Sequence, residues 1–168
     1  GDPRRQETYA CGDVNTSLIK TALGRTIMVQ FDLVTPRPYS RLNLICGTDG
    51  TFADYPPRIN LKGKGHKWET DLAPYFEKYG HPLWKRQKEQ ALKSSGHGGM
   101  DYLMNLRLIQ CLLAGSPLDM TVYDAAAWSS IFPLSTSSVA QGRSPVKAPD
   151  FTRGQWKLPR PLLAAAEV

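Results

Sequence analysis

The sequence is poor in the residues that most often mark a metal or redox site. It has only three cysteines and three histidines in 168 residues. Cys11, Cys46 and Cys111 form no CxxC pair and, being odd in number, no complete disulfide framework, so buried thiols are expected. The histidines lie on different predicted elements and share no helical turn. The sequence therefore predicts no metal site.

Several other signatures are missing. No apolar run is long enough to span a membrane. Gly63 and Gly65 are followed by Trp68 where a dinucleotide fingerprint needs its third glycine, and there is no P-loop or G-x-S-x-G elbow. No pair of acidic residues stands out as the two carboxylates of an ordinary glycosidase. By itself the chain shows no catalytic constellation, and no catalytic residue is assigned.

The chain is basic, with 21 Lys and Arg against 15 Asp and Glu and a net charge of +6. The positive residues concentrate at 62–67 and 85–93. Such a balance permits contact with nucleic acid or another polyanion, while a solvated basic face is the alternative. A polyanion-binding module ranks last among the hypotheses, because aromatic residues are not interleaved with the lysines. We therefore expect no nucleic-acid partner and no membrane partner.

Composition indicates a globular chain with one core, since 41% of the residues are apolar. The first residues contain neither an initiator Met nor a signal peptide, so we expect a cut from a longer protein and leave the compartment open. Such a piece should expose apolar surface where other parts dock. It can also self-associate as a homo-oligomer through open sheet edges.

The first part of the chain predicts antiparallel strands. Residues 17–21 form a short strand, and residues 25–34 alternate over a length typical of a half-buried strand. Pro36 and Pro38 end it. Alternation resumes at 41–46, Asp49-Gly50 is a hairpin turn, and Ile59 lies in one further strand.

The rest of the chain predicts helices, with an N-cap at Asp71 and a break at residues 80–82. Residues 100–113 are apolar over most of the circumference, so this helix should be buried against a sheet. A capping box at Thr121-x-x-Asp124 opens the next helix, which Pro133 should kink. Residues 146–151 are expected to return as an edge strand. The predicted fold is α+β, a mainly antiparallel open sheet covered by helices, over residues 1–156, with a frayed tail at 157–168.

Two local features bear on function. In the run Pro-Arg-Pro-Tyr-Ser-Arg at 36–41, two prolines stiffen the backbone beside Tyr39, whose ring and hydroxyl suit a sugar; a turn tyrosine at the core margin is the alternative. The run Gly-His-Gly-Gly at 96–99 opens the apolar helix. Its glycines permit close approach of a ligand, or form a hinge.

Eight segments in this order resemble one family: 12–16, 24–30, 36–45, 55–59, 96–102, 107–112, 117–124 and 149–156. They are similar to the C-terminal part of glycoside hydrolase family 109, whose named activity is α-N-acetylgalactosaminidase. That family belongs to the Gfo/Idh/MocA group of sugar oxidoreductases. The resemblance implies that residues 1–156 are part of a C-terminal substrate-binding domain, without the N-terminal Rossmann domain that holds NAD.

The resemblance also implies a mechanism for the complete protein: oxidation at C3 of the sugar by NAD, elimination, addition of water and re-reduction. The implied partner is a carbohydrate with terminal α-N-acetylgalactosamine. Tyr39 matches the family's substrate-binding tyrosine, and Arg41 and His97 are added as substrate-binding residues because they lie near the motifs. The acid/base residues and the cofactor site are expected upstream, so this chain alone should be inactive. A sugar oxidoreductase of the same fold that uses NAD(P) is the alternative. Members of the family are often exported from bacterial cells through an N-terminal signal.

Overall fold

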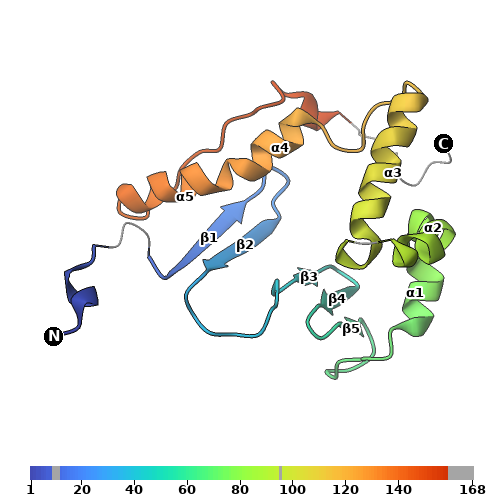
Figure 1. Cartoon of the computed structure of the whole chain (residues 1–168), viewed down its shortest axis with the longest axis horizontal. Helices are drawn as coiled ribbons and strands as arrows, with labels where there is room; N and C mark the ends of the chain where they lie inside the picture. The colour runs from blue at the N-terminus through green and yellow to red at the C-terminus, as the bar shows by residue number, and fades with distance from the viewer. Residues whose placement is uncertain (9–11, 95, 159–168) are drawn as a thin grey trace.

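The computed structural model describes residues 1–8, 12–94 and 96–158. Within these ranges the chain forms five strands, five α-helices and three short 3₁₀ helices. All strand pairs are antiparallel. The predicted α+β class with antiparallel strands is confirmed, and Figure 1 shows that strands come first along the chain and helices follow.

The first sheet is a hairpin of β1 (Val14–Lys20) and β2 (Thr26–Asp32). The alternation in β2 predicts a half-buried strand, but Ile27 and Phe31 on one face are 47% and 58% exposed. Met28 on the other face is 67% exposed. The prediction of a half-buried strand was therefore wrong. Alternation reports which residues share a face, whereas burial needs a second element to cover that face.

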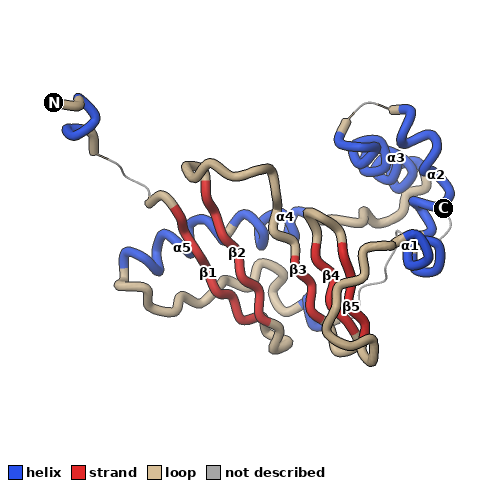
Figure 2. Tube along the Cα trace, turned by 90° about the horizontal axis from the view of Figure 1, so that it is seen from below, coloured by secondary structure: helices blue, strands red, loops and turns tan. Residues whose placement is uncertain are grey.

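The second sheet is a meander of β3 (Leu44–Cys46), β4 (Gly50–Ala53) and β5 (Arg58–Leu61). The predicted turn at Asp49-Gly50 falls at the connection from β3 to β4, with Gly50 as the first residue of β4. Figure 2 shows the two sheets next to each other, joined by the segment of residues 33–43. The strands thus form two sheets, since Pro36 and Pro38 in this segment cannot donate ladder hydrogen bonds.

Two helices follow the second sheet. Helix α1 (Ala73–Tyr79) begins after Leu72, and the Asp71 carboxylate accepts a hydrogen bond from the N–H of Ala73 at 3.2 Å. Asp71 therefore caps the helix from one position earlier than expected. Helix α2 (Pro82–Lys93) begins at the predicted break, where His81 Nδ1 accepts from the N–H of Leu83.

Helix α3 (Met100–Leu113) follows the 3₁₀ turn η2 (His97–Gly99). It packs against α2 and η2, and no sheet covers it among the described residues. Its buried residues are Arg107 and Cys111, while Leu112 is 65% exposed. The prediction of burial against a sheet was wrong, because an apolar circumference shows what a helix can bury and does not supply the partner.

The predicted capping box opens α4 (Val122–Ser129): the Asp124 carboxylate accepts from the N–H and the hydroxyl of Thr121 at 2.7 and 2.9 Å. A separate helix, α5 (Ile131–Ala140), follows directly. Instead of the expected kink at Pro133, the structure has a break between two helices at Ser130. Inside a helix, the proline ring clashes with the carbonyl of the residue four positions earlier. In the first turn of a new helix there is no such carbonyl, so proline fits there.

The last described segment runs back beside α5 (Figures 1 and 2). Residues 146–151 form no strand, so the predicted edge strand was wrong; Pro149, within these residues, removes a donor that a ladder needs. The chain instead ends in a turn and the 3₁₀ helix η3 (Gln155–Lys157). Another, η1 (Pro3–Gln6), lies near the start. Residues 159–168 of the predicted frayed tail lie outside the described residues.

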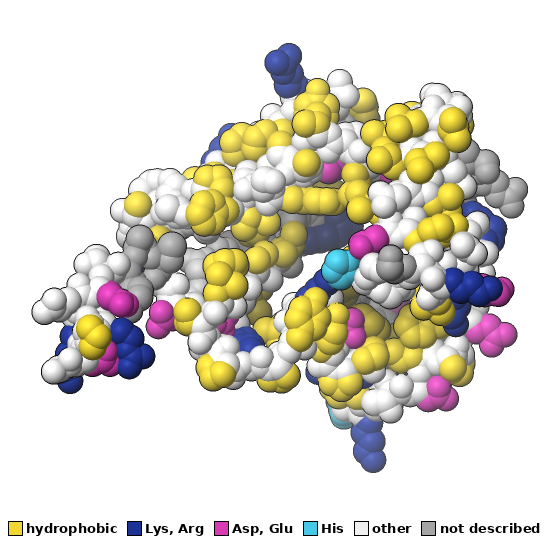
Figure 3. Space-filling view, in the orientation of Figure 1, with side chains coloured by type: hydrophobic (Ala, Val, Ile, Leu, Met, Phe, Trp, Pro, Cys, Tyr) yellow, Lys and Arg dark blue, Asp and Glu magenta, His cyan; other side chains and the backbone are white. Residues whose placement is uncertain are grey.

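The chain leaves much of its apolar surface in contact with solvent. Its accessible surface is 14191 Å², whereas a compact protein of 18.7 kDa has about 8,300 Å². Side chains that are nearly enclosed are few, among them Ala53, Ala91 and Cys111. Figure 3 shows hydrophobic side chains spread over the face toward the viewer. The expected exposed apolar surface is present, while self-association through sheet edges stays a prediction.

Candidate functional site

Tyr39 lies in the segment between the two sheets, and Asp32 at the end of β2 holds the start of this segment. The Asp32 carboxylate accepts from the N–H groups of Val34 and Thr35 and from the Thr35 hydroxyl, and it pairs with Arg37. The hydrogen bond from Thr35 lowers the pKa of Asp32, so the carboxylate stays charged and keeps these partners. One carboxylate therefore holds the backbone that leads from β2 to Tyr39.

Arg41 and Tyr55 surround Tyr39. Arg41 Nε donates to the Tyr39 hydroxyl oxygen at 2.8 Å. The Tyr55 ring lies edge-on to the Tyr39 ring, with centroids 5.5 Å apart. The hydrogen bond to Tyr39 raises the pKa of Arg41, so its guanidinium stays a permanent donor. Tyr39 is 70% exposed, and an oriented phenol thus faces solvent.

The backbone around the two tyrosines is held in the left-handed region. Leu42 has φ 48° and Tyr55 has φ 61°. Bulky residues adopt such angles at a cost on the order of 1 kcal/mol or more, and only when their surroundings impose them. Here the Asp54 carboxylate accepts from the N–H of Tyr55 at 2.7 Å, and the Asp54 N–H donates to the Asn43 carbonyl at 2.9 Å. These bonds tie the two segments together.

His97 lies on a different part of the chain. Its Nδ1 is 2.9 Å from an oxygen of Asp101, and its side chain is 68% exposed. Among the described residues the structure gives His97 no hydrogen bond or ring contact with Tyr39 or Arg41. Of the three residues predicted to bind substrate, Tyr39 and Arg41 are joined by a hydrogen bond, whereas the hydrogen-bond partner of His97 is Asp101.

The glycines beside His97 have a packing role. A Cβ on Gly99, whose φ is 92°, would lie 2.8 Å from the backbone of Ala91 in α2. A Cβ on Gly96 would lie 2.4 Å from the Asp101 carboxylate. The sequence left two interpretations for these glycines, close approach of a ligand or a hinge. In the structure the close approach is made by the chain itself, at the α2–α3 contact.

The start of α3 does not suit the pyrophosphate of a dinucleotide. A pyrophosphate at a helix N-terminus needs open N–H groups and no competing negative charge. At the start of α3 the Asp101 carboxylate already lies in the first turn, beside His97. The described residues also hold no group of three His, Cys, Asp or Glu side chains placed for a metal ion. In that part of the chain no helix is both long and apolar enough to cross a membrane.

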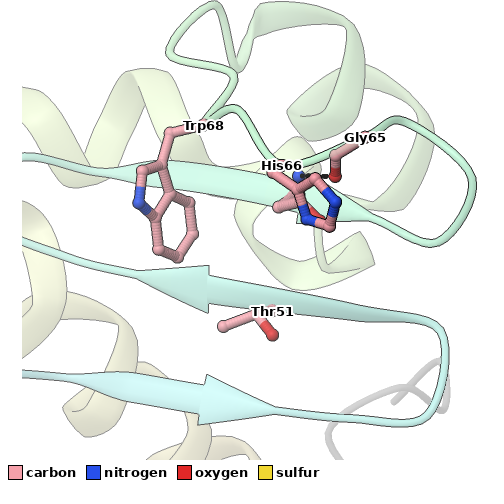
Figure 4. Close-up of a pocket in the computed structure, with 5 residues that line it drawn as sticks. Thr51, Gly65, His66 and Trp68 are labelled. Carbon is pink, nitrogen blue, oxygen red and sulfur yellow. Dashed lines mark hydrogen bonds between the residues drawn. The ribbon is translucent and has the colours of Figure 1, made fainter.

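Sequence reasoning missed two parts of the site. Tyr55 was not singled out, although Asp-Tyr-Pro-Pro at 54–57 is a turn-forming run that brings it back to Tyr39. The second is a hollow against β4 and β5 that is lined by the segment around Trp68, shown in Figure 4. The glycines at 63 and 65 were considered only as a failed fingerprint, but both have positive φ and turn this segment back over the sheet.

Comparison with known proteins places the chain in a family. A family model described as "Glycosyl hydrolase 109, C-terminal domain" matches residues 1–158. A glycosyl hydrolase family 109 protein of Shewanella amazonensis is 55% identical over 163 residues, which are 95% of this chain and 36% of the relative. Glycosyl hydrolase family 109 protein 1 of Akkermansia muciniphila is 55% identical over 161 residues, 92% of this chain and 34% of the relative. The chain spans about a third of the length of the curated relatives it matches.

Proposed function

The chain belongs to glycosyl hydrolase family 109 through that family's C-terminal domain, and we propose that it supplies the sugar-binding part of an NAD-dependent glycosidase. The family resemblance drawn from the eight motifs is thereby confirmed. The proposed substrate is a carbohydrate that carries terminal α-linked N-acetylgalactosamine. The proposed role of residues 1–156 is to bind and orient this sugar.

The oriented phenol of Tyr39 carries the proposal. Its ring is exposed, and its oxygen already accepts a hydrogen bond from Arg41 Nε at 2.8 Å. Because that lone pair is used, the hydroxyl proton is directed elsewhere and is available to a sugar oxygen. The ring face can contact the apolar face of a pyranose. Tyr39 thus offers an apolar surface and one directed donor.

Arg41 acts as a positioning residue for Tyr39, with Tyr55 packed against the ring edge. This order is formed before ligand arrives, so the loss of side-chain freedom on binding is small. His97 is proposed to contact substrate from the helical part, with Asp101 holding its Nδ1. The imidazole is then oriented with Nε2 away from that contact.

The proposal assigns NAD mainly to the N-terminal domain of the complete protein, as the family resemblance implies. The start of α3 is unsuited to a pyrophosphate, since the Asp101 carboxylate lies in its first turn. The steps that belong to this chain are therefore binding and orientation of the sugar. Consistent with this assignment, we expect the 168-residue chain alone to hydrolyse no aryl α-N-acetylgalactosaminide.

The test uses the full-length gene product that contains this chain, with p-nitrophenyl α-N-acetylgalactosaminide as substrate. Tyr39→Phe should raise KM roughly 3- to 10-fold, the effect of one lost hydrogen bond. Tyr39→Ala, which also removes the ring, should raise KM further. Tyr123→Phe is the matched control, because Tyr123 is an exposed tyrosine on α4.

Equal KM values for both Tyr39 variants and the Tyr123 control would contradict the proposed site. Net NADH formation from sugars without glycoside cleavage would instead assign a sugar dehydrogenase of the same fold. Activity of the 168-residue chain by itself would show that the reacting groups lie within it.

A further inference from the structure

The hollow beside Trp68 is a second place where this chain presents a ring and polar groups to solvent. It has a volume of about 270 Å³ and is lined by Thr51, Asn60, Gly65, His66 and Trp68. Figure 4 shows Trp68 and His66 projecting toward the strand that carries Thr51, with open space between the two rings. Sites for drug-sized ligands measure roughly 300–1,000 Å³, so this hollow suits a ligand of one ring.

Hydrogen bonds fix the walls of the hollow. The side-chain amide of Asn60 donates to the carbonyls of Gly65 and Lys67 at 3.0 and 2.8 Å. Ile59 and Glu69 exchange two backbone hydrogen bonds at the base of the loop, at 2.9 and 2.8 Å. The loop that carries His66 and Trp68 is therefore held against β5 by four hydrogen bonds. A ligand would meet a wall that is already ordered.

The chemistry of the lining matches a sugar ring. Trp68 is 44% exposed, and the Arg58 guanidinium lies 5.0 Å from its ring centroid and limits its movement. An indole surface suits the apolar face of a pyranose, while the Thr51 hydroxyl and the His66 imidazole both donate and accept hydrogen bonds. The lysines of the same loop do not line the hollow. The lining therefore favours a neutral sugar over an anion.

Contacts lead from this hollow to Tyr39. The Tyr55 ring touches the Tyr39 ring, and Arg58 Nη1 donates to the carbonyl of Pro56, the next residue after Tyr55, at 2.9 Å. Arg58 in turn lies over Trp68. Arg58 and Asn60 share one face of β5, on the order of 7 Å apart. Contacts of Tyr55, Pro56 and Arg58 thus link the Tyr39 ring to the Trp68 ring.

We propose that the hollow between Trp68, His66 and Thr51 is a second sugar subsite, which binds another pyranose of the glycan whose terminal sugar contacts Tyr39. The inference rests on the proposed function and deepens it: the substrate is an oligosaccharide or glycoconjugate, and this chain binds two of its units. Trp68 supplies the stacking surface, and Thr51 and His66 supply hydrogen bonds to ring hydroxyls.

The test uses the full-length gene product labelled with 5-fluorotryptophan. The fluorine resonance of Trp68 is assigned by its loss in Trp68→Phe. The probes are methyl α-N-acetylgalactosaminide, an α-linked N-acetylgalactosaminyl-galactose disaccharide, and sodium sulfate. The disaccharide should shift the Trp68 resonance, whereas the methyl glycoside and sulfate should not.

Affinity provides the second measurement. Trp68→Ala should weaken disaccharide binding roughly 3- to 10-fold, the range of one aromatic contact, and leave methyl glycoside binding unchanged. Thr51→Val, which keeps the strand-forming shape, should weaken disaccharide binding in the same direction. Trp128→Ala is the matched control, since Trp128 is an exposed tryptophan on α4.

The outcomes separate the two proposals. A Trp68 resonance that no sugar moves, or that sulfate alone moves, overturns the subsite, whatever the hydrolysis assay shows. A Trp68 shift with the disaccharide together with absent hydrolysis supports the subsite as a sugar site and counts against the proposed function. Loss of the shift in Tyr39→Ala would support one glycan that spans both sites.

Discussion

Arg107 offers the sharpest test of how the helical part is held together. It is the one charged residue that is buried among those described, at 7% exposure. Its Nε and Nη2 donate to the two oxygens of Asp119 at 2.9 and 2.8 Å. This pair joins α3 to the segment that leads into α4. The hydrogen bond to Asp119 raises the pKa of Arg107, so the guanidinium stays charged.

The expected magnitude follows from the exposure of each partner. Removing one partner of a buried ion pair costs about 3–5 kcal/mol, because the other charge is left unpaired. In Arg107→Leu the charge left behind is Asp119, whose side chain is 25% exposed and gains water. We therefore expect about 2–3 kcal/mol for Arg107→Leu, below the range for a fully buried pair. Asp119→Leu strands the guanidinium, whose side chain is 8% exposed, and should cost more. The double variant should cost less than the sum of the two.

Hydrogen exchange of the full-length gene product measures this local stability. A loss of 2–3 kcal/mol corresponds to roughly 30- to 140-fold faster exchange of the α3 amides when opening is in rapid equilibrium. Arg86→Leu on α2 is the control, since Arg86 is exposed and its loss should change exchange little. If Arg107→Leu exchanges no faster than Arg86→Leu, or if the two single effects simply add, the reasoning is refuted.

Two further predictions concern a glycine contact and a turn. Gly99→Ala should destabilise the α2–α3 contact by about 3 kcal/mol, because overpacking and the positive φ act together. Gly98→Ala has a positive φ but meets open space, so it should cost about 1 kcal/mol. Equal rates of amide hydrogen exchange in the two variants would contradict this. The hydrogen bond from the Thr152 hydroxyl holds the pKa of Asp150 below its ordinary value of 3.8. The stability that this carboxylate gives the turn is therefore fully present above pH 3.8, and it is lost as the pH falls through the lower pKa of the folded state. The Trp156 indole, which donates to Asp150 at 3.2 Å, should report this acid transition in its fluorescence, and Asp150→Asn should abolish it.

Local sequence signals predicted the structure correctly where the interactions that form it lie within a few residues of one another. The Thr121 and Asp124 side chains form the expected cap, and the break at residues 80–82 separates two helices as predicted. The spacing of apolar residues also located α3. It did not show that Leu112 would be exposed, because exposure depends on a partner surface that no residue of the helix encodes.

The sequence by itself determined the family, the order of strands and helices, and Tyr39 as the residue to examine. Only the tertiary structure decided which side chains contact it: Arg41 donates a hydrogen bond to Tyr39, and Tyr55, at the turn between β4 and β5, packs against its ring. It also placed the loop that carries Trp68 against β5. Capping, proline breaks and alternation act between near neighbours and are visible in the sequence. A contact between distant residues depends on the path of the backbone, which here passes through left-handed positions such as Leu42 and Gly65 that no periodicity records.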